Sequence, residues 1–206
     1  ESNGMICSEN ELNISDEHDG IMVLPNNLEL GNNFMEEYGN KFISLELDIT
    51  PNRPDAFSHQ GVARDIACVT GRKFSPISVN PVESKNTLTI DVSMEDNKDC
   101  PRYIAGLIEN VKIGPSPDWL IERLTSAGQR SINNVVDISN FVLMEIGHPT
   151  HIFDYDKLKN KKIFVRRSKN GESIVTLDEQ KHILNDKNLL ITDGDNPIAL
   201  AGIMGG

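Results

Sequence analysis

The first clear pattern in the chain is an alternation of apolar and polar residues at 43–49. This segment reads ISLELDI, and an apolar residue at every second position is typical of a strand with one buried face. The turn-forming sequence TPNRPD follows, and a helix with apolar residues on one side then extends as far as Gly71. Asp55 or Ser58 can cap the start of this helix, and Gly71 ends it.

A proline-containing stretch at 72–86 separates this region from a longer series of short strands and two helices. In the first of these helices Ser116 is placed to cap, Pro117 fits the first turn, and Gly128 ends the helix. The second helix covers 133–147. Apolar segments bounded by turns predict strands at 87–93, 102–113, 162–167, 173–178 and 188–193, followed by a closing segment at 198–206.

Together these elements predict an α+β fold, with short-stranded mixed or antiparallel sheets and a few helices, in two bodies. The apolar runs of residues 1–39 are too short to form a core of their own, so we interpret this region as the tail of a larger domain. Residues 40–80 form a small domain of strand, turn and helix. Residues 81–206 form the main α+β domain.

The composition is that of a folded, water-soluble chain. Of the 206 residues, 38% are hydrophobic and 25% are charged, which favours a globular protein over a disordered one. No apolar run approaches the length of a membrane span, and the first residues lack the basic and apolar parts of a signal peptide. We therefore expect a cytoplasmic protein without membrane contact. Cys7, Cys68 and Cys100 are too scattered for a disulfide framework or a zinc knuckle.

The net charge of -11 is distributed unevenly. Residues 1–50 contain eleven acidic side chains and only one basic side chain, Lys41, so they cannot form a nucleic-acid surface by themselves. A basic cluster lies further on. It could contact phosphate, or it could be a solvated face of strands and turns. The cluster consists of Lys157, Lys159, Lys161, Lys162, Arg166, Arg167 and Lys169.

The segment GHPTHIFD at 147–154 carries the densest candidate chemistry in the chain. His148, His151 and Asp154 are spaced by threes, which on a helix would place two imidazoles and a carboxylate on one face. Pro149 pushes the preceding residue toward extended geometry, so the three side chains need not converge. We expect no metal here, and the residues alone leave a structural histidine and a functional histidine as open alternatives.

Three long motifs give the chain a resemblance to a known family. LELDITPNRPDAFSHQGVARDIA, INNVVDISNFVLMEIGHPTHIFD and the final ALAGIMGG occur in this order, and together they resemble the beta subunit of bacterial phenylalanine-tRNA ligase. The resemblance covers essentially the whole chain. It implies that 1–39 is the end of an oligonucleotide-binding-type tRNA-recognition domain, and that 81–206 is an editing module truncated at its C-terminal end.

The resemblance also implies a function for individual residues. The family's editing module hydrolyses tyrosine that has been wrongly attached to phenylalanine tRNA. By the match of motifs, His151 senses the tyrosine hydroxyl, Ser139 and Asn140 belong to the pocket, and Gly205 lines the amino-acid site. A side chain at Gly205 would fill the space that the ring of the amino acid needs. The catalytic residues remain unknown.

Some features depart from the family's pattern. His148 stands where the family commonly has glutamine, Thr150 replaces an apolar residue, and Ser139 replaces threonine. A glutamate that shares the tyrosine hydroxyl with the histidine lies, in the family, beyond the glycine motif and hence after Gly206. Because no nucleophile motif is present, ester hydrolysis would have to use water, with backbone N–H groups of the GIMGG turn as possible donors to the oxyanion.

The same resemblance implies partners and cofactors for the whole enzyme. A ligase of this family joins two alpha and two beta subunits, binds phenylalanine tRNA, and uses ATP and magnesium to attach phenylalanine. No phosphate-cradling glycine loop is visible in this chain, so we expect no cofactor to bind it. The alternative to an editing site is an architectural or tRNA-docking segment without editing activity of its own.

Overall fold

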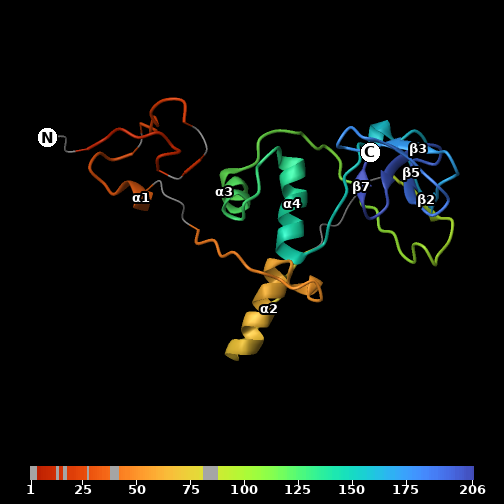
Figure 1. The fold of residues 1–206 in the computed structure, drawn as a ribbon, viewed down its shortest axis with the longest axis horizontal. Helices are drawn as coiled ribbons and strands as arrows, with labels where there is room; N and C mark the ends of the chain where they lie inside the picture. Colours follow the sequence, from red (N-terminus) through yellow and green to blue (C-terminus); the bar gives the residue numbers. More distant parts are fainter. Residues whose placement is uncertain (1–3, 13, 16–17, 27, 38–41, 81–87) are drawn as a thin grey trace. The chain divides into compact units, whose positions relative to one another are not determined.

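The computed structural model describes residues 4–12, 14–15, 18–26, 28–37, 42–80 and 88–206 (Figure 1). The chain forms two compact units, each built from two separate stretches of sequence. The first unit contains Glu1–Pro54 and Pro115–Phe141, and the second contains Asp55–Gly114 and Val142–Gly206. The division of the chain into 1–39, 40–80 and 81–206 stays a prediction.

The described residues confirm the α+β fold, with mixed and antiparallel sheets and a few helices. Short strands predominate in the last third of the chain. No helix in the described parts of the chain is long and apolar enough to cross a membrane. The elements are α1 (Phe34–Glu37), η1 (Pro54–Ala56), α2 (His59–Thr70), β1 (Asp91–Met94), α3 (Asp118–Ser126), α4 (Asn134–Ile146), η2 (Tyr155–Lys157), β2 (Lys162–Arg167), β3 (Ser173–Val175), β4 (Lys181–Ile183), β5 (Leu189–Thr192), β6 (Pro197–Leu200) and β7 (Met204–Gly205).

A five-stranded sheet in the order β1-β2-β5-β6-β7 forms the body of the second unit. β1 pairs with β2 in parallel, and the other neighbours pair antiparallel. β3 and β4 form a separate antiparallel hairpin. Ile174 of this hairpin packs with Leu184, Leu190 and the partly buried Leu200, so an apolar core joins the hairpin to the sheet.

Helix α2 confirms the predicted helix after TPNRPD and decides which residue caps it. The hydroxyl of Ser58 accepts a hydrogen bond from the Gly61 N–H at 3.0 Å, so Ser58 rather than Asp55 is the N-cap. Gly71 ends the helix with a left-handed backbone, φ 67°. Gly61 packs so tightly on the preceding turn that a Cβ there would lie 2.8 Å from the Asp55 carbonyl carbon and closer still to its oxygen.

Two predicted strands do not form in the described residues. The alternating segment 43–49 has no strand pairing, and Ile43 and Leu45 are 93% and 78% exposed. The same holds for 102–113, where Ile104 and Ile108 are largely exposed. Both predictions were wrong for one reason: alternation specifies a face, but a strand also needs a neighbour to bond its backbone, and local sequence does not supply that neighbour.

The helices α3 and α4 lie at the predicted positions, but Ser116 has a different role. Pro117 occupies the N-cap of α3 without a side-chain cap, whereas the Ser116 hydroxyl donates to the buried Asp137 carboxylate of α4 at 2.5 Å. Burial by itself would raise the pKa of Asp137, but hydrogen bonds from Ser116, Ser131 and the Ile132 N–H outweigh it and lower the pKa. A buried carboxylate therefore ties α4 to the segment before α3.

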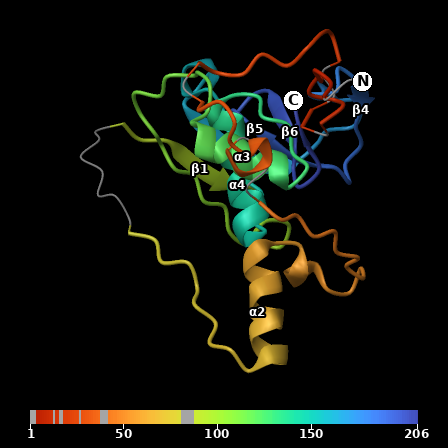
Figure 2. The ribbon, with the colours of Figure 1, turned by 90° about the vertical axis from the view of Figure 1, so that its left-hand side faces the viewer.

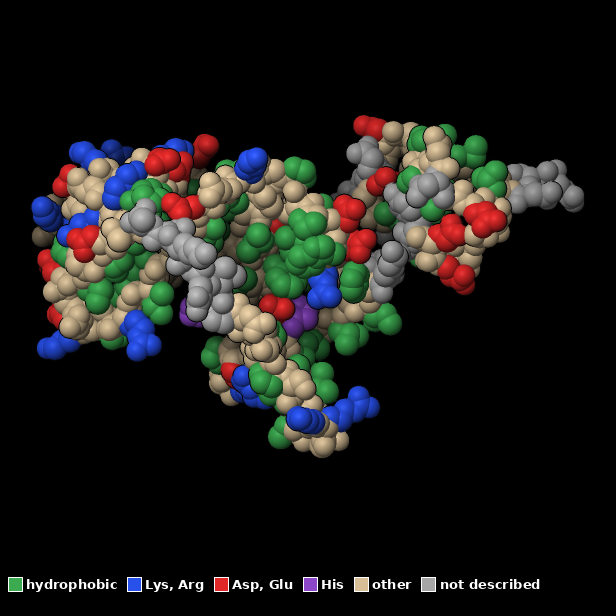
Figure 3. All heavy atoms as spheres, turned by 180° about the vertical axis from the view of Figure 1, so that it is seen from behind, with side chains coloured by type: hydrophobic (Ala, Val, Ile, Leu, Met, Phe, Trp, Pro, Cys, Tyr) green, Lys and Arg blue, Asp and Glu red, His purple; other side chains and the backbone are tan. Residues whose placement is uncertain are grey.

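The basic cluster of the second unit is largely paired with acidic groups. Figure 3 shows basic and acidic side chains interspersed over this part of the surface. A surface of this kind matches the solvated face of strands and turns better than a phosphate site. The pairs are Lys157 with Asp154, Lys159 with Asp195, Lys161 with Asp156, Lys162 with Asp91, Arg166 with Glu172, and Arg167 with Asp99.

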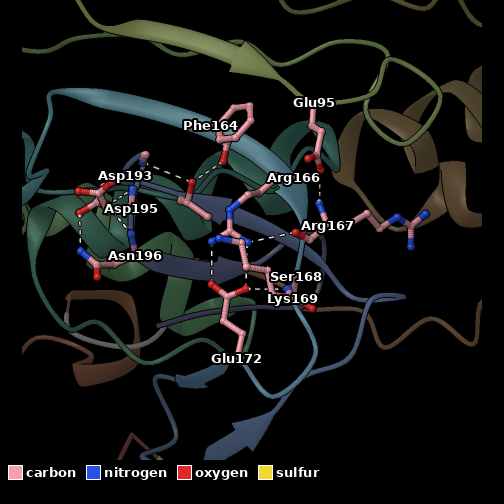
Figure 4. A network of polar contacts seen from close by, with 12 residues as sticks. Glu95, Phe164, Arg166, Arg167, Ser168, Lys169, Glu172, Asp193, Asp195 and Asn196 are labelled. Atoms are coloured by element: carbon pink, nitrogen blue, oxygen red, sulfur yellow. Dashed lines mark hydrogen bonds and ion pairs between the residues drawn. The ribbon is translucent and has the colours of Figure 1, made fainter.

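The pair between Arg166 and Glu172 is the best shielded of these (Figure 4). The two terminal nitrogens of the Arg166 guanidinium donate to the two carboxylate oxygens of Glu172 at 2.9 and 2.7 Å. The Lys169 N–H donates a third hydrogen bond to the same carboxylate. The hydrogen bonds from Arg166, opposed by partial burial, lower the pKa of Glu172 to about 2. This pair fixes the turn between β2 and β3.

We expect Glu172→Gln to destabilise the second unit by about 3 kcal/mol at neutral pH, because it leaves a shielded guanidinium without its counterion. Since folding lowers the pKa of Glu172 from 4.5 to about 2, the stabilisation is complete above pH 4.5 and is lost as the pH falls toward 2. Hydrogen exchange of the β2 and β5 amides measures this free energy. Glu179→Gln, on the exposed turn of the β3-β4 hairpin, is the matched control; equal losses in the two variants would contradict the prediction.

Candidate functional site

The start of α2 holds the end of α4, from which the chain leads to His151. The Nδ1 atom of His59 lies 2.8 Å from the Met144 carbonyl oxygen, and the ribbon shows these two helix ends side by side (Figures 1 and 2). Gly147 then takes a positive φ of 74°, and a Cβ on it would lie 3.2 Å from the Ser58 side chain. The helix therefore stops at the predicted glycine, and 148–154 leaves it without forming a helix.

The His151 ring has an aromatic neighbour and a strand backbone close to it. Its centroid lies 4.5 Å from that of Phe153 in an edge-on arrangement. The ring also approaches Gly205: a Cβ built on this glycine would lie 2.7 Å from the His151 Nε2 and closer still to its Cε1. Two residues that the sequence assigned to one site therefore come together in the second unit.

A side chain at Gly205 would first meet the imidazole of His151. That it would also fill the space needed by a ligand ring stays a prediction. Gly205 is buried in β7 and pairs with Ala199 of β6. Its lack of a side chain is what allows the imidazole to lie against the strand.

The other two predicted pocket residues lie in the first unit. Ser139 and Asn140 are on α4, and both are partly buried. His151 and Gly205 belong to the second unit. The contact between His151 and Gly205 is thus the part of the predicted site that lies within one compact unit.

Partial burial lowers the pKa of His151 below its usual value of 6.5, because a desolvated imidazole favours its neutral form. A neutral imidazole has one nitrogen that donates and one that accepts. The residue is also exposed to solvent. It can therefore exchange hydrogen bonds with a hydroxyl group at neutral pH.

The remaining members of GHPTHIFD do not join His151 in a metal site. The Asp154 carboxylate caps its own turn, accepting from the Asp156 N–H at 3.0 Å, and lies 3.9 Å from the Lys157 ammonium. In the described parts of the chain, no group of three or more His, Cys, Asp or Glu side chains could hold a metal ion.

The final turn has fewer available backbone donors than its glycines suggest. The Ile203 N–H bonds to the Leu200 carbonyl oxygen and the Gly206 N–H bonds to the Ile198 carbonyl oxygen, both at 3.0 Å. These two groups complete the sheet edge and cannot also stabilise an oxyanion.

One neighbour of His151 and Gly205 was missed by the sequence reasoning. Leu177 reaches the same point from the β3-β4 hairpin, and a Cβ on Gly205 would lie 3.1 Å from its Cδ1. The sequence predicts one strand over 173–178, whereas β3 ends at Val175. The pair Asp178 and Glu179 is a turn signal that could have placed Leu177 in the turn.

Comparisons with known proteins agree with the motifs. Residues 99–206 match the family described as the B3/4 domain. Over its whole length the chain is 50% identical to the phenylalanine–tRNA ligase beta subunit of Geobacter sulfurreducens, 48% identical to that of Syntrophotalea carbinolica and 44% identical to that of Thermotoga maritima. It spans 26% of the length of each of these relatives. The chain belongs to the B3/4 domain family, and the relatives to which it is similar are phenylalanine–tRNA ligase beta subunits.

Proposed function

We propose that this chain contributes an editing pocket to the beta subunit of a phenylalanine–tRNA ligase, where tyrosine mischarged on phenylalanine tRNA is hydrolysed. The observation that carries the proposal is the close approach of the His151 ring to the backbone of Gly205, which has no side chain. The bare backbone leaves room for the imidazole to lie against β7 while the residue stays exposed to solvent. The resemblance also implies Ser139 and Asn140 of α4 as pocket residues, and for these two it is the only support.

The physical need for such a pocket follows from the chemistry of the two amino acids. A site that accepts phenylalanine excludes the same ring with one added hydroxyl by only about a hundredfold. A second site that hydrogen-bonds the hydroxyl has the opposite preference. Phenylalanine there would leave the His151 imidazole unpaired, at a cost of roughly 1 to 3 kcal/mol.

In the complete enzyme we assign the remaining steps to other parts. Attachment of phenylalanine would use ATP and magnesium together with the alpha subunit. We assign neither cofactor to residues of this chain: in its described parts no group of three or more His, Cys, Asp or Glu side chains could hold a metal ion, and its sequence has no phosphate-cradling glycine loop. The ester bond would be cleaved by water that the pocket positions, with oxyanion donors other than the Ile203 and Gly206 amides.

We expect His151→Ala, in the complete ligase that carries this chain, to slow hydrolysis of tyrosyl-tRNA about tenfold or more, because the phenol hydroxyl loses a partner. Attachment of phenylalanine stays near normal, since that chemistry lies elsewhere. Deacylation of preformed tyrosyl-tRNA measures the first rate and aminoacylation the second. His148→Ala, three residues away in the same segment and exposed, serves as the control.

Two results would favour an architectural or tRNA-docking role instead. One is an unchanged deacylation rate in the His151→Ala enzyme. The other comes from titrating the chain with both amino acids: an editing pocket binds tyrosine in preference to phenylalanine, whereas an architectural segment binds neither.

Gly205→Ala should reproduce the loss caused by His151→Ala, because the added methyl group displaces the imidazole from β7. The double variant should be no worse than His151→Ala alone, since the severe clash disappears with the ring and the remaining 3.1 Å approach to the Leu177 Cδ1 is relieved by a small shift of that exposed side chain. Deacylation rates of the two single variants and the double variant form the required cycle. Gly106→Ala is the control, because a Cβ there meets nothing within 4 Å. Additive losses in the double variant would contradict the proposed contact between His151 and Gly205.

The protonation of His151 should have its midpoint below pH 6.5, because partial burial lowers the pKa. A pKa lowered by folding means that the native state binds fewer protons than the unfolded state. The second unit therefore loses stability as the pH falls below 6.5. An NMR titration of the His151 ring gives the midpoint, with His151→Ala identifying the resonance, and a midpoint above 6.5 would contradict the prediction.

A further inference from the structure

Leu177 meets the candidate site through its backbone as well as its side chain. Its N–H donates to the Gly205 carbonyl oxygen at 3.0 Å, so the hairpin is fastened to β7 at this residue. Its Cδ1 lies on the same side of Gly205 as the His151 ring, because a single Cβ position would contact both. An apolar side chain and a neutral imidazole therefore stand next to each other over one glycine.

The turn that carries Leu177 is tightly fixed. The Thr176 N–H donates to the Gln180 carbonyl oxygen at 3.0 Å, and the Glu179 N–H donates to the Thr176 carbonyl oxygen at 2.8 Å. The Thr176 hydroxyl, on a residue that is 4% exposed, bonds to the Asp178 carboxylate. These hydrogen bonds close the turn on both sides of Leu177 and hold its position relative to β7.

The side chain of Leu177 is nevertheless 71% exposed. The same hairpin exposes Ile183 of β4 to a similar degree, 79%, so exposure alone does not distinguish Leu177. What distinguishes Leu177 is that it lies against Gly205 beside the ring of His151. An exposed apolar side chain on a fixed backbone, next to a polar side chain, suits a ligand that has both an apolar ring and a hydroxyl group.

We propose that Leu177 is a substrate-binding residue of the editing pocket and packs against the aromatic ring of the aminoacyl group. This inference rests on the proposed function. The ring is common to tyrosine and phenylalanine, so Leu177 contributes affinity for both and does not distinguish them. Discrimination falls to His151, which meets the hydroxyl. The two residues therefore have separable effects on kinetics.

The test uses the complete ligase with preformed tyrosyl-tRNA and phenylalanyl-tRNA as substrates. Leu177→Ala should raise the KM for deacylation of tyrosyl-tRNA roughly four- to fifteenfold, as expected for the loss of one or two buried carbons, and leave kcat nearly unchanged. The ratio of kcat/KM for the two substrates should stay constant. His151→Ala should change that ratio.

Two further variants keep the result interpretable. Leu177→Met preserves apolar volume and should recover most of the affinity that Leu177→Ala loses, whereas Ile183→Ala removes a similarly exposed side chain from the same hairpin and should have no effect. The inference is overturned if Leu177→Ala matches Ile183→Ala, if Leu177→Met is as impaired as Leu177→Ala, or if Leu177→Ala changes the substrate ratio. Failure of the unaltered ligase to deacylate tyrosyl-tRNA would overturn the proposed function and this inference with it. An effect of His151→Ala without one of Leu177→Ala would overturn the inference alone.

Discussion

The close approach of the His151 imidazole to the backbone of Gly205 is the contact on which the candidate site depends. It requires a strand edge without a side chain at one position, and it requires that edge to be held still. Pairing of Gly205 with Ala199 fixes β7 to the sheet, and the Leu177 N–H fixes it to the hairpin. Since side chains pack at close to crystalline density, a single methyl group at Gly205 is enough to displace the ring.

Those parts of the fold that depend on local chemistry could be predicted from the sequence. Ser58 and Gly71 delimit α2 through a side-chain cap and a left-handed residue, and both signals lie next to the helix they end. β2 was found at its observed bounds. The segments 43–49 and 102–113 were not, because the hydrogen bonds of a strand go to a distant part of the chain.

Long-range polar contacts were equally hidden from the sequence. Ser116 has the right residue type and position for a cap, yet its hydroxyl is better used by the buried carboxylate of Asp137, where it offsets the cost of burying a charge. The basic cluster had the composition of a phosphate site, but acids from other segments, such as Asp91 and Asp99, neutralise it. Asp137, Asp91 and Asp99 all lie far in sequence from the groups they bind, and residue type alone cannot reveal such partners.

The contact that defines the candidate site is also a long-range one, and the residues of GHPTHIFD alone do not reveal it. Spacing within GHPTHIFD allowed several interpretations of His151, and only the resemblance linked it to Gly205. Within the proposed pocket, one hydroxyl partner worth roughly 1 to 3 kcal/mol corresponds to a factor of about five to a hundred and fifty in selectivity. An apolar wall adds nothing to that factor, because both amino acids present the same ring to it. Reversing the preference for phenylalanine therefore requires polar groups at the hydroxyl, and the His151 imidazole, whose pKa partial burial lowers, can serve there in its neutral form as donor or acceptor.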